Sequence, residues 1–246
     1  MIGVFDSGVG GLSALSPLAH LLPRADILYY ADTAALPLGV KSEEEILERL
    51  LLALRFFEQA GVSGVLLACG TASSLLTQKC KASFAFPIVD IIAPTASALR
   101  ALPKDTRTLF LGTPAAVRAA RFPSLLARGA APIFSLPCPA LVSLAESGRA
   151  SYRRVARVLS PARDLSPRAV VLGCTHFSLL SAEIAAVFPA AHIFDAAALG
   201  AAAAASRLSP SGEGTLRFRT TGDPAHFNER ASRILSRTVR AEKLLP

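Results

Sequence analysis

Short apolar segments of strand length alternate with helical patterns along nearly the whole chain. This alternation is typical of βα units wound into mostly parallel sheets. We expect strands at residues 2–5, 26–30, 64–69, 87–92, 107–111, 132–136, 169–173, 191–194 and 215–220. The sequence therefore predicts an α/β fold.

Two of the helical patterns contain local signals for where a helix begins, bends or ends. Residues 42–45 form a capping box, and apolar residues then recur at helical spacing as far as Phe57, before Gly61 stops the pattern. The pattern over residues 12–22 contains Pro17, which either kinks the helix or begins it.

The chain length supports two α/β domains. With 246 residues, 52% of them hydrophobic, the chain can bury one large core or two smaller ones. A break near residues 94–103 separates two stretches that resemble a diverged internal duplication, although any two βα units ending in cysteine would look similar. The last βα unit does not show which sheet it joins, and we place it with the first domain. We predict pseudo-twofold-related domains, residues 1–97 with 208–246 and residues 98–207, with the active site in the cleft between them.

Two cysteines occupy matching positions in these halves. Cys69 and Cys174 each end an apolar run and precede small or hydroxyl residues. At the carboxyl end of a parallel strand a thiol lies where ligands bind, and a helix N-terminus there can lower its pKa. A free cysteine is also a common small core residue, but the paired contexts favour a paired acid and base.

Composition argues against several other classes. The formal charge of +8 favours anionic ligands, but Arg149, Arg153 and Arg157 have the spacing of a solvated helix face. Only 7% of the residues are aromatic, so platforms for stacking bases are scarce and nucleic-acid binding is not expected.

Targeting and metal signals are also missing from the sequence. No apolar run approaches the roughly 18 residues of a membrane span. Asp6 interrupts any signal-peptide core, so we expect a cytoplasmic protein with reduced thiols. The four cysteines form no CxxC pair and no zinc-ligand spacing beyond Cys174-x-His176, so we expect no structural metal.

A glycine-rich turn follows the first strand. The turn is Asp6-Ser7-Gly8-Val9-Gly10-Gly11. It departs from the dinucleotide-binding pattern because position 13 is Ser13 instead of glycine, and because the acidic Asp6 in the turn would repel a pyrophosphate. The turn suits a small carboxylate ligand, with Asp6 as a base, a proton relay or a partner for a substrate ammonium. Alternatively, Asp6 caps a tight turn.

Residues 2–13 resemble the amino-terminal motif of the glutamate racemases, members of the cofactor-independent aspartate/glutamate racemase family. Further matches follow in family order: Tyr30-Ala31-Asp32-Thr33 with Pro37-x-Gly39, Ala68-Cys69-x-Thr71, Gly112-Thr113, Cys138-Pro139 with Glu146-Ser147-Gly148, Leu172-Gly173-Cys174-Thr175-His176 and Thr220-Thr221-Gly222. Because the motifs span nearly the whole chain in one order, the resemblance is specific.

The resemblance implies interconversion of L- and D-glutamate for peptidoglycan synthesis, without a cofactor. Cys69 and Cys174 would remove and return the Cα proton on opposite faces of the substrate. The family pattern implies further catalytic residues: Asp6 and Ser7 beside Cys69, and His176 and Glu146 beside Cys174. Donors to the substrate carboxylate would be Ser7, Thr71, Thr113, Thr175 and the backbone amides around Gly39.

Three positions depart from the family. Leu38, Gly70 and Ala116 stand where the family has tyrosine, asparagine and threonine. The alternatives are therefore a related racemase or isomerase with a less polar substrate, of aspartate or hydantoin type, or a catalytically weakened amino-acid-binding homologue. A thiol-disulfide enzyme fits the widely separated cysteines poorly. The family also suggests a homodimer.

Overall fold

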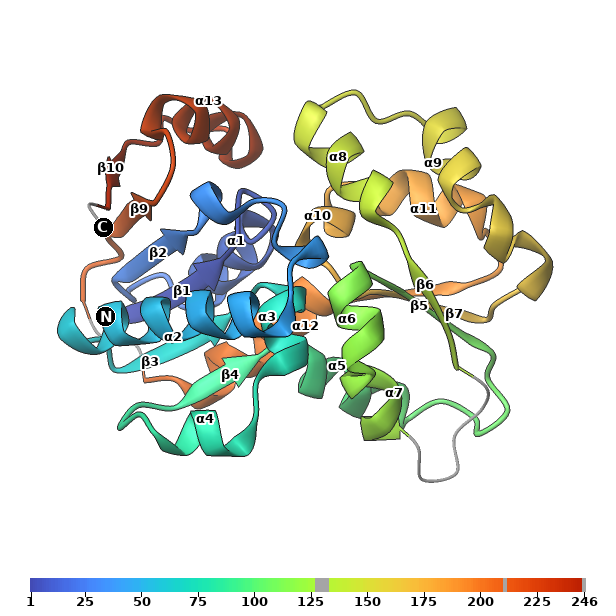
Figure 1. Cartoon of the computed structure of the whole chain (residues 1–246), viewed down its shortest axis with the longest axis horizontal. Helices are drawn as coiled ribbons and strands as arrows, with labels where there is room; N and C mark the ends of the chain where they lie inside the picture. The colour runs from blue at the N-terminus through green and yellow to red at the C-terminus, as the bar shows by residue number, and fades with distance from the viewer. Residues whose placement is uncertain (127–132, 210–211, 245–246) are drawn as a thin grey trace.

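The computed structural model describes residues 1–126, 133–209 and 212–244. Its first sheet contains β1 (Ile2–Asp6), β2 (Ile27–Ala31), β3 (Gly64–Leu67), β4 (Ile88–Asp90), β9 (Leu216–Thr220) and β10 (Ala241–Lys243). Its second sheet contains β5 (Thr108–Gly112), β6 (Ile133–Pro137), β7 (Ala169–Leu172) and β8 (His192–Asp195). All strand pairs are parallel, and the sheets lie side by side (Figure 1), which confirms the α/β prediction.

The nine expected strands all form, with ends shifted by at most a few residues. Residue 132, the expected start of β6, lies outside the described residues. Strand β10 was not expected, because its residues Ala-Glu-Lys have no apolar pattern. It exists through pairing with β9.

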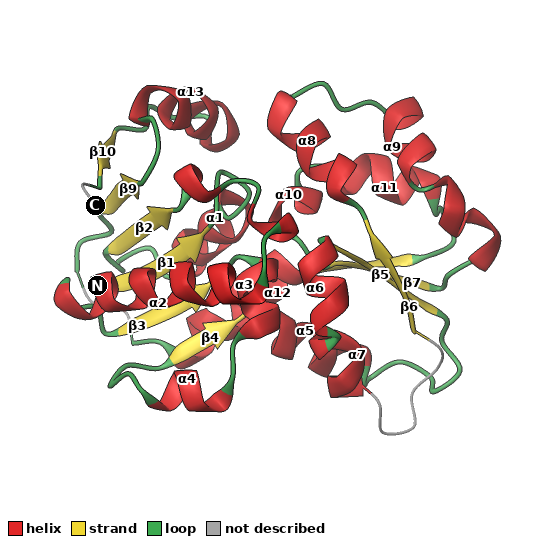
Figure 2. Cartoon of the chain, in the orientation of Figure 1, coloured by secondary structure: helices red, strands yellow, loops and turns green. Residues whose placement is uncertain are grey.

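Helices cover both faces of the first sheet (Figure 2). Those of the first half are α1 (Leu12–Leu21), α2 (Glu43–Gln59), α3 (Gly70–Leu75), α4 (Gln78–Ala82) and α5 (Ile92–Leu99), with 3-10 turns at Thr33–Ala35 and Leu38–Val40. The second half adds α6 (Pro114–Ala119), α7 (Arg121–Leu126), α8 (Pro139–Ser147), α9 (Tyr152–Val158), a 3-10 turn at Ser160–Leu165, α10 (Thr175–Ser178) and α11 (Ser181–Val187). Helices α12 (Ala196–Arg207) and α13 (Pro224–Leu235) complete the chain.

The local helix signals are confirmed in detail. Ser42 and Glu45 form the capping box in both directions, with N···O distances of 3.0 and 3.2 Å. Helix α2 ends just before Gly61, whose φ of +64° favours glycine. Helix α1 contains Pro17 in its interior, so it does not begin there.

Strand order supports the expected duplication. The sequence β2-β1-β3-β4 in the first sheet repeats as β6-β5-β7-β8 in the second. Cys69 and Cys174 follow the equivalent strands β3 and β7, so their matching contexts reflect matching places in the two halves. Strand β9 pairs with β2, and the last βα unit therefore belongs to the first sheet.

The halves are joined by a shared core. Helix α12 leads from the second sheet back to the first and packs against α1, and one buried cluster contains residues of both sheets. Helix α5 occupies most of the expected break, with Pro94 in its first turn, where proline is tolerated. The domain limits at 97/98 and 207/208 stay a prediction.

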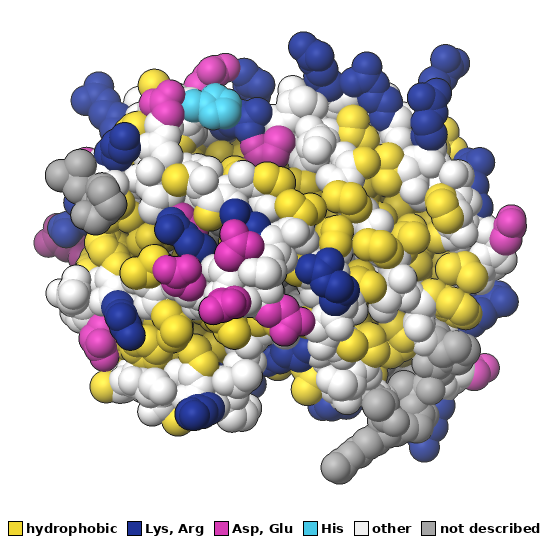
Figure 3. All heavy atoms as spheres, viewed as in Figure 1, with side chains coloured by type: hydrophobic (Ala, Val, Ile, Leu, Met, Phe, Trp, Pro, Cys, Tyr) yellow, Lys and Arg dark blue, Asp and Glu magenta, His cyan; other side chains and the backbone are white. Residues whose placement is uncertain are grey.

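The surface agrees with the charge analysis. Arg149, Arg153 and Arg157 are all exposed. The expected helix face is only partly correct, because Arg153 and Arg157 lie in α9 whereas Arg149 lies in the loop between α8 and α9. On the face shown in Figure 3, Lys and Arg side chains are scattered, with Asp and Glu side chains between them. Among the described helices, none has the length and apolar character needed to cross a membrane.

Candidate active site

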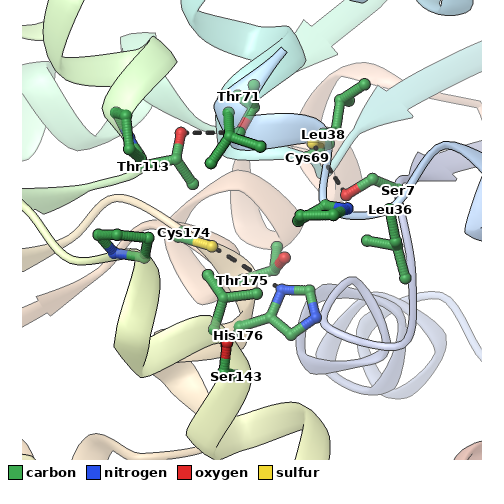
Figure 4. Close-up of a pocket in the computed structure, with 16 residues that line it drawn as sticks. Ser7, Leu36, Leu38, Cys69, Thr71, Thr113, Ser143, Cys174, Thr175 and His176 are labelled. Atoms are coloured by element: carbon green, nitrogen blue, oxygen red, sulfur yellow. Dashed lines mark hydrogen bonds between the residues drawn. The ribbon is translucent and has the colours of Figure 1, made fainter.

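A pocket of about 570 Å³, including its open mouth, lies between the two halves (Figure 4). The first half contributes Ser7, Leu36, Pro37, Leu38, Gly39, Val40, Cys69 and Thr71. The second half contributes Thr113, Pro114, Pro139, Val142, Ser143, Cys174, Thr175 and His176. Because Ser7, Cys69, Thr113 and Cys174 each come directly after a strand or one residue later, the pocket lies where carboxyl ends of both sheets meet.

The thiol of Cys69 lies on the first-half side of the pocket. Cys69 comes directly before α3, is 3% exposed, and its Sγ is 3.6 Å from Oγ of Ser7. Burial, followed by the charge of Asp6, raises the pKa of Cys69 to about 12. In the unliganded protein this residue is therefore a protonated thiol at neutral pH.

The thiol of Cys174 belongs to a chain of side chains on the second-half side. Its Sγ lies 3.8 Å from Nδ1 of His176, and Nε2 of His176 lies 2.5 Å from Oε1 of Glu146. Burial lowers the pKa of His176, but the hydrogen bond to Cys174 and the charges of Cys174 and Asp6 raise it overall. Glu146 orients the imidazole without lining the pocket itself.

Asp6 lies beneath the pocket, outside its lining. Its carboxylate accepts hydrogen bonds from the backbone N–H of Gly8 at 2.9 Å and from Oγ1 of Thr175 at 3.0 Å. Burial raises the pKa of Asp6, partly offset by the charge of His176 and by these hydrogen bonds. Asp6 thus contacts the second half through Thr175, and its charge acts on both Cys69 and His176.

Two glycines of the first turn leave room for these groups. A β-carbon at position 10 would lie 2.6 Å from Nδ1 of His176, and one at position 11 would lie 2.4 Å from Cβ of Asp6. Since real β-carbons do not approach so closely, Gly10 and Gly11 let α1 begin against the site. This explains the glycine-rich turn without any phosphate.

The five residues expected to bind substrate all line the pocket: Ser7, Gly39, Thr71, Thr113 and Thr175. Oγ1 of Thr71 and Oγ1 of Thr113 lie 2.9 Å apart, so these hydroxyls meet from opposite halves. Thr113 also accepts a hydrogen bond from the backbone N–H of Ala116 at 3.3 Å and caps α6.

The three departures from the family pattern have different surroundings. Leu38 lines the pocket with 1% of its surface exposed, and Ala116 is buried behind Thr113. Gly70 faces Gly173 of the other half at very short range, and position 70 has no room for a side chain.

Sequence reasoning missed much of the pocket wall. The pocket is also lined by residues that carry no local signal: Leu36, Val40, Pro114, Val142 and Ser143. Apolar residues of a turn or a helix look like core residues in the sequence, and Ser143 looks like an ordinary polar residue of α8. It also missed Arg230, which forms an ion pair with Glu146. Among the residues that the structure describes, no group of three or more His, Cys, Asp or Glu side chains could hold a metal ion.

Comparisons with known proteins agree with this architecture. Residues 14–205 match the family described as Asp/Glu/Hydantoin racemase. A glutamate racemase of Herpetosiphon aurantiacus is 37% identical over 92% of this chain and 94% of its own length. The crystal structure of Thermus thermophilus glutamate racemase with β-chloro-D-alanine has a TM-score of 0.87 and 32% identity, covering 99% of this chain and 96% of that one. Francisella tularensis glutamate racemase, solved with D-glutamate, has a TM-score of 0.90 and 26% identity, covering 99% and 97%.

Proposed function

This chain belongs to the Asp/Glu/Hydantoin racemase family, and we propose that it interconverts L-glutamate and D-glutamate with two thiols as acid and base. The observation that carries the proposal is that Cys69 and Cys174, one from each half, line the same pocket. Inverting a Cα centre requires a proton to leave one face and another to arrive on the opposite face. Relatives of full length are named glutamate racemases, which supports glutamate as the substrate.

In the proposed mechanism one cysteine, as thiolate, removes the Cα proton, and the other, as thiol, donates a proton to the opposite face. The raised pKa of Cys69 suits it to the donor role in the unliganded enzyme. In the reverse direction Cys69 must lose its proton first, and Asp6 is the nearby candidate to assist. His176 would exchange a proton with Cys174 through Nδ1 while Glu146 holds Nε2.

The carbanion next to the substrate carboxylate must be stabilised by hydrogen-bond donors aimed at that carboxylate. Hydroxyls of Ser7, Thr71 and Thr113 line the pocket and are the proposed donors, with backbone amides around Gly39. The hydroxyl of Thr175 also lines the pocket, but its one O–H donates to Asp6, so it would have to release Asp6 before it could donate to the substrate. These hydrogen bonds would stabilise the carbanion in place of a cofactor such as pyridoxal phosphate, which serves as the electron sink in other enzymes.

We further propose that the enzyme works in the cytoplasm and supplies D-glutamate for peptidoglycan. A homodimer is also proposed, from the family resemblance alone. Sedimentation at several protein concentrations tests it, and a single monomeric species would refute it.

The mechanism is tested by following deuterium incorporation at Cα in heavy water, starting from each enantiomer of glutamate. The wild type should exchange and racemise, whereas Cys69→Ser and Cys174→Ser should each lose racemisation by several orders of magnitude. Cys80→Ser is the matched control, since Cys80 is a free, partly exposed cysteine outside the pocket, and should retain activity. Absence of exchange into glutamate would refute the substrate assignment.

A less polar substrate is the second candidate. The apolar side chains of Leu36, Leu38, Val40 and Val142 form much of the wall, where a glutamate side-chain carboxylate would gain few direct partners. Exchange into a hydantoin, but not into glutamate, would select this candidate, whereas exchange into aspartate alone would indicate a shorter acidic substrate. Calorimetric binding of glutamate without any exchange would instead mark a binding protein.

A further inference from the structure

Arg230 of α13 forms an ion pair with Oε2 of Glu146 in α8. The other carboxylate oxygen of Glu146, Oε1, faces Nε2 of His176 at 2.5 Å. A single carboxylate is therefore held between a guanidinium from the C-terminal βα unit, which joins the first sheet, and an imidazole of the second half. In Figure 1, α13 and α8 stand opposite each other across the gap between the halves.

The surroundings strengthen this chain of contacts. Side-chain exposure falls from 24% at Arg230 to 17% at Glu146 and 3% at His176. Charge-assisted hydrogen bonds gain strength as water is excluded. Within the described residues, Arg230 is the only Lys or Arg that forms an ion pair with Glu146.

The orientation of the imidazole follows from the carboxylate. When Glu146 accepts a hydrogen bond from Nε2–H, the neutral ring has its lone pair on Nδ1, which faces Sγ of Cys174 at 3.8 Å. In that tautomer Nδ1 can take the thiol proton and return it. A carboxylate free to rotate would no longer select one tautomer or one ring orientation.

We propose that Arg230 is a positioning residue for proton transfer at Cys174. Its guanidinium fixes the Glu146 carboxylate, which in turn presents Nδ1 of His176 to the thiol. The inference rests on the proposed two-thiol mechanism and adds to it that one proton-transfer step depends on a residue of the opposite half. Arg230 itself does not line the pocket.

The test compares Arg230→Met and Arg230→Lys with Arg233→Met. Arg233 lies one turn further along α13 and pairs with Glu229 at the exposed surface, so it is a matched control that should behave like the wild type. Removing a residue that orients a catalytic histidine is expected to lower kcat about 10- to 100-fold, by analogy with the loss of groups that orient metal-bound histidines. Arg230→Lys, which keeps the charge, should recover part of that loss.

Isotope effects separate positioning from a general structural role. With α-deuterated L- and D-glutamate, a slower step at Cys174 makes the substrate isotope effect rise for the enantiomer whose proton Cys174 removes. For the other enantiomer, Cys174 donates a proton instead of removing one, so the slowed step is the reprotonation of Cα. The substrate isotope effect then falls toward unity and the solvent isotope effect rises. Cys174→Ser identifies which enantiomer is which. A merely loosened cleft would shift both enantiomers in the same sense.

A second measurement does not depend on turnover. Nitrogen NMR of the wild type, recorded at a pH high enough to keep the imidazole neutral despite its raised pKa, should show His176 as the Nε2–H tautomer, and Arg230→Met should show a mixture or the opposite tautomer. An unchanged tautomer with unchanged isotope effects would overturn the proposal. If the wild type exchanges another amino acid instead of glutamate, the glutamate assignment fails, and the same isotope comparison with that amino acid still decides the role of Arg230.

Discussion

Gly70 meets Gly173 across the cleft so closely that a β-carbon at position 70 would lie 2.0 Å from the carbonyl oxygen of Gly173. Gly70 directly follows Cys69, and Gly173 directly precedes Cys174. The contact therefore joins the two thiol-bearing segments. In this chain the missing side chain at position 70 permits that close approach.

Substituting Gly70→Ala should separate the two segments. The oxygen of Gly173 belongs to the backbone and cannot rotate away, so the halves must shift. Misplacement by about 1 Å can cost on the order of 100-fold in rate, and we expect a loss of kcat/KM of that size. Gly70→Asn, which restores the family residue, should be at least as harmful. Steady-state racemisation in both directions measures the effect.

Gly61→Ala is the control for this prediction. Position 61 has no atoms within 4 Å of a new β-carbon, but its φ is +64°, so alanine there strains the backbone and should cost about 1 kcal/mol of stability. It should leave kcat/KM unchanged. Full activity in Gly70→Ala or Gly70→Asn would show that the contact between the segments is not required.

The hydroxyls of Thr71 and Thr113 offer a double-mutant test. If the two hydroxyls release each other and each donates its single O–H to the bound substrate, as proposed, the losses of kcat/KM in Thr71→Val and Thr113→Val should multiply in the double variant. If the hydroxyls serve only each other at 2.9 Å, the double variant should be no worse than either single one. We expect each single change to cost about 1.5 to 3 kcal/mol of transition-state binding, because the partner carboxylate is charged.

The raised pKa of Cys69 predicts slow alkylation at neutral pH. Only the thiolate reacts, so the rate with iodoacetamide should rise about tenfold per pH unit up to a pKa of about 12. Because the charge of Asp6 contributes to the raised pKa of Cys69, Asp6→Asn should lower the pKa of this thiol and speed its alkylation at any pH below that pKa. Peptide mapping by mass spectrometry measures each site separately.

D-Glutamate should protect Cys69 in this experiment, while Cys80, which lies outside the pocket, should not be protected. Rapid alkylation of Cys69 at pH 7 would contradict the prediction.

Asp90 should stabilise the fold in a pH-dependent way. Its carboxylate, 1% exposed, contacts Lys81 at 3.0 Å, Arg121 at 2.9 Å and two backbone N–H groups at the start of α5. Burial raises the pKa of Asp90, but the hydrogen bond and charge of Arg121 outweigh it and lower the pKa overall. The stabilisation is therefore present above the unfolded-state pKa near 3.8 and is lost as the pH falls below it.

We expect Asp90→Asn to lower the free energy of unfolding by about 3–5 kcal/mol at pH 7, since two cations lose their buried partner. Urea titrations between pH 7 and pH 3 should show this difference shrinking at the acid end. Glu229→Gln, which removes an exposed ion pair with Arg233, should change stability by less than about 1 kcal/mol. A difference between Asp90→Asn and wild type that is constant with pH would contradict the pKa argument.

Much of the architecture is encoded locally. Nine strands, the capping box of α2 and the pairing of Cys69 with Cys174 follow from short patterns, because strand and helix periodicities are set by neighbouring residues. The motif residues expected to bind substrate all reach the pocket, since carboxyl ends of parallel strands meet at one edge. Asp6 acts on Cys69 through its charge, and Glu146 reaches Cys174 only through His176, but neither lines the pocket.

The α/β class, the family and the two thiols could all be predicted from the sequence, because each depends on short patterns of neighbouring residues. Three relationships became visible only in the folded chain: β9 and β10 extend the first sheet, Gly70 lies against Gly173, and Arg230 pairs with Glu146. These relationships join segments far apart in the chain. They depend on which surfaces are buried against one another in the folded chain, and a local pattern of residues does not predict which surfaces those are.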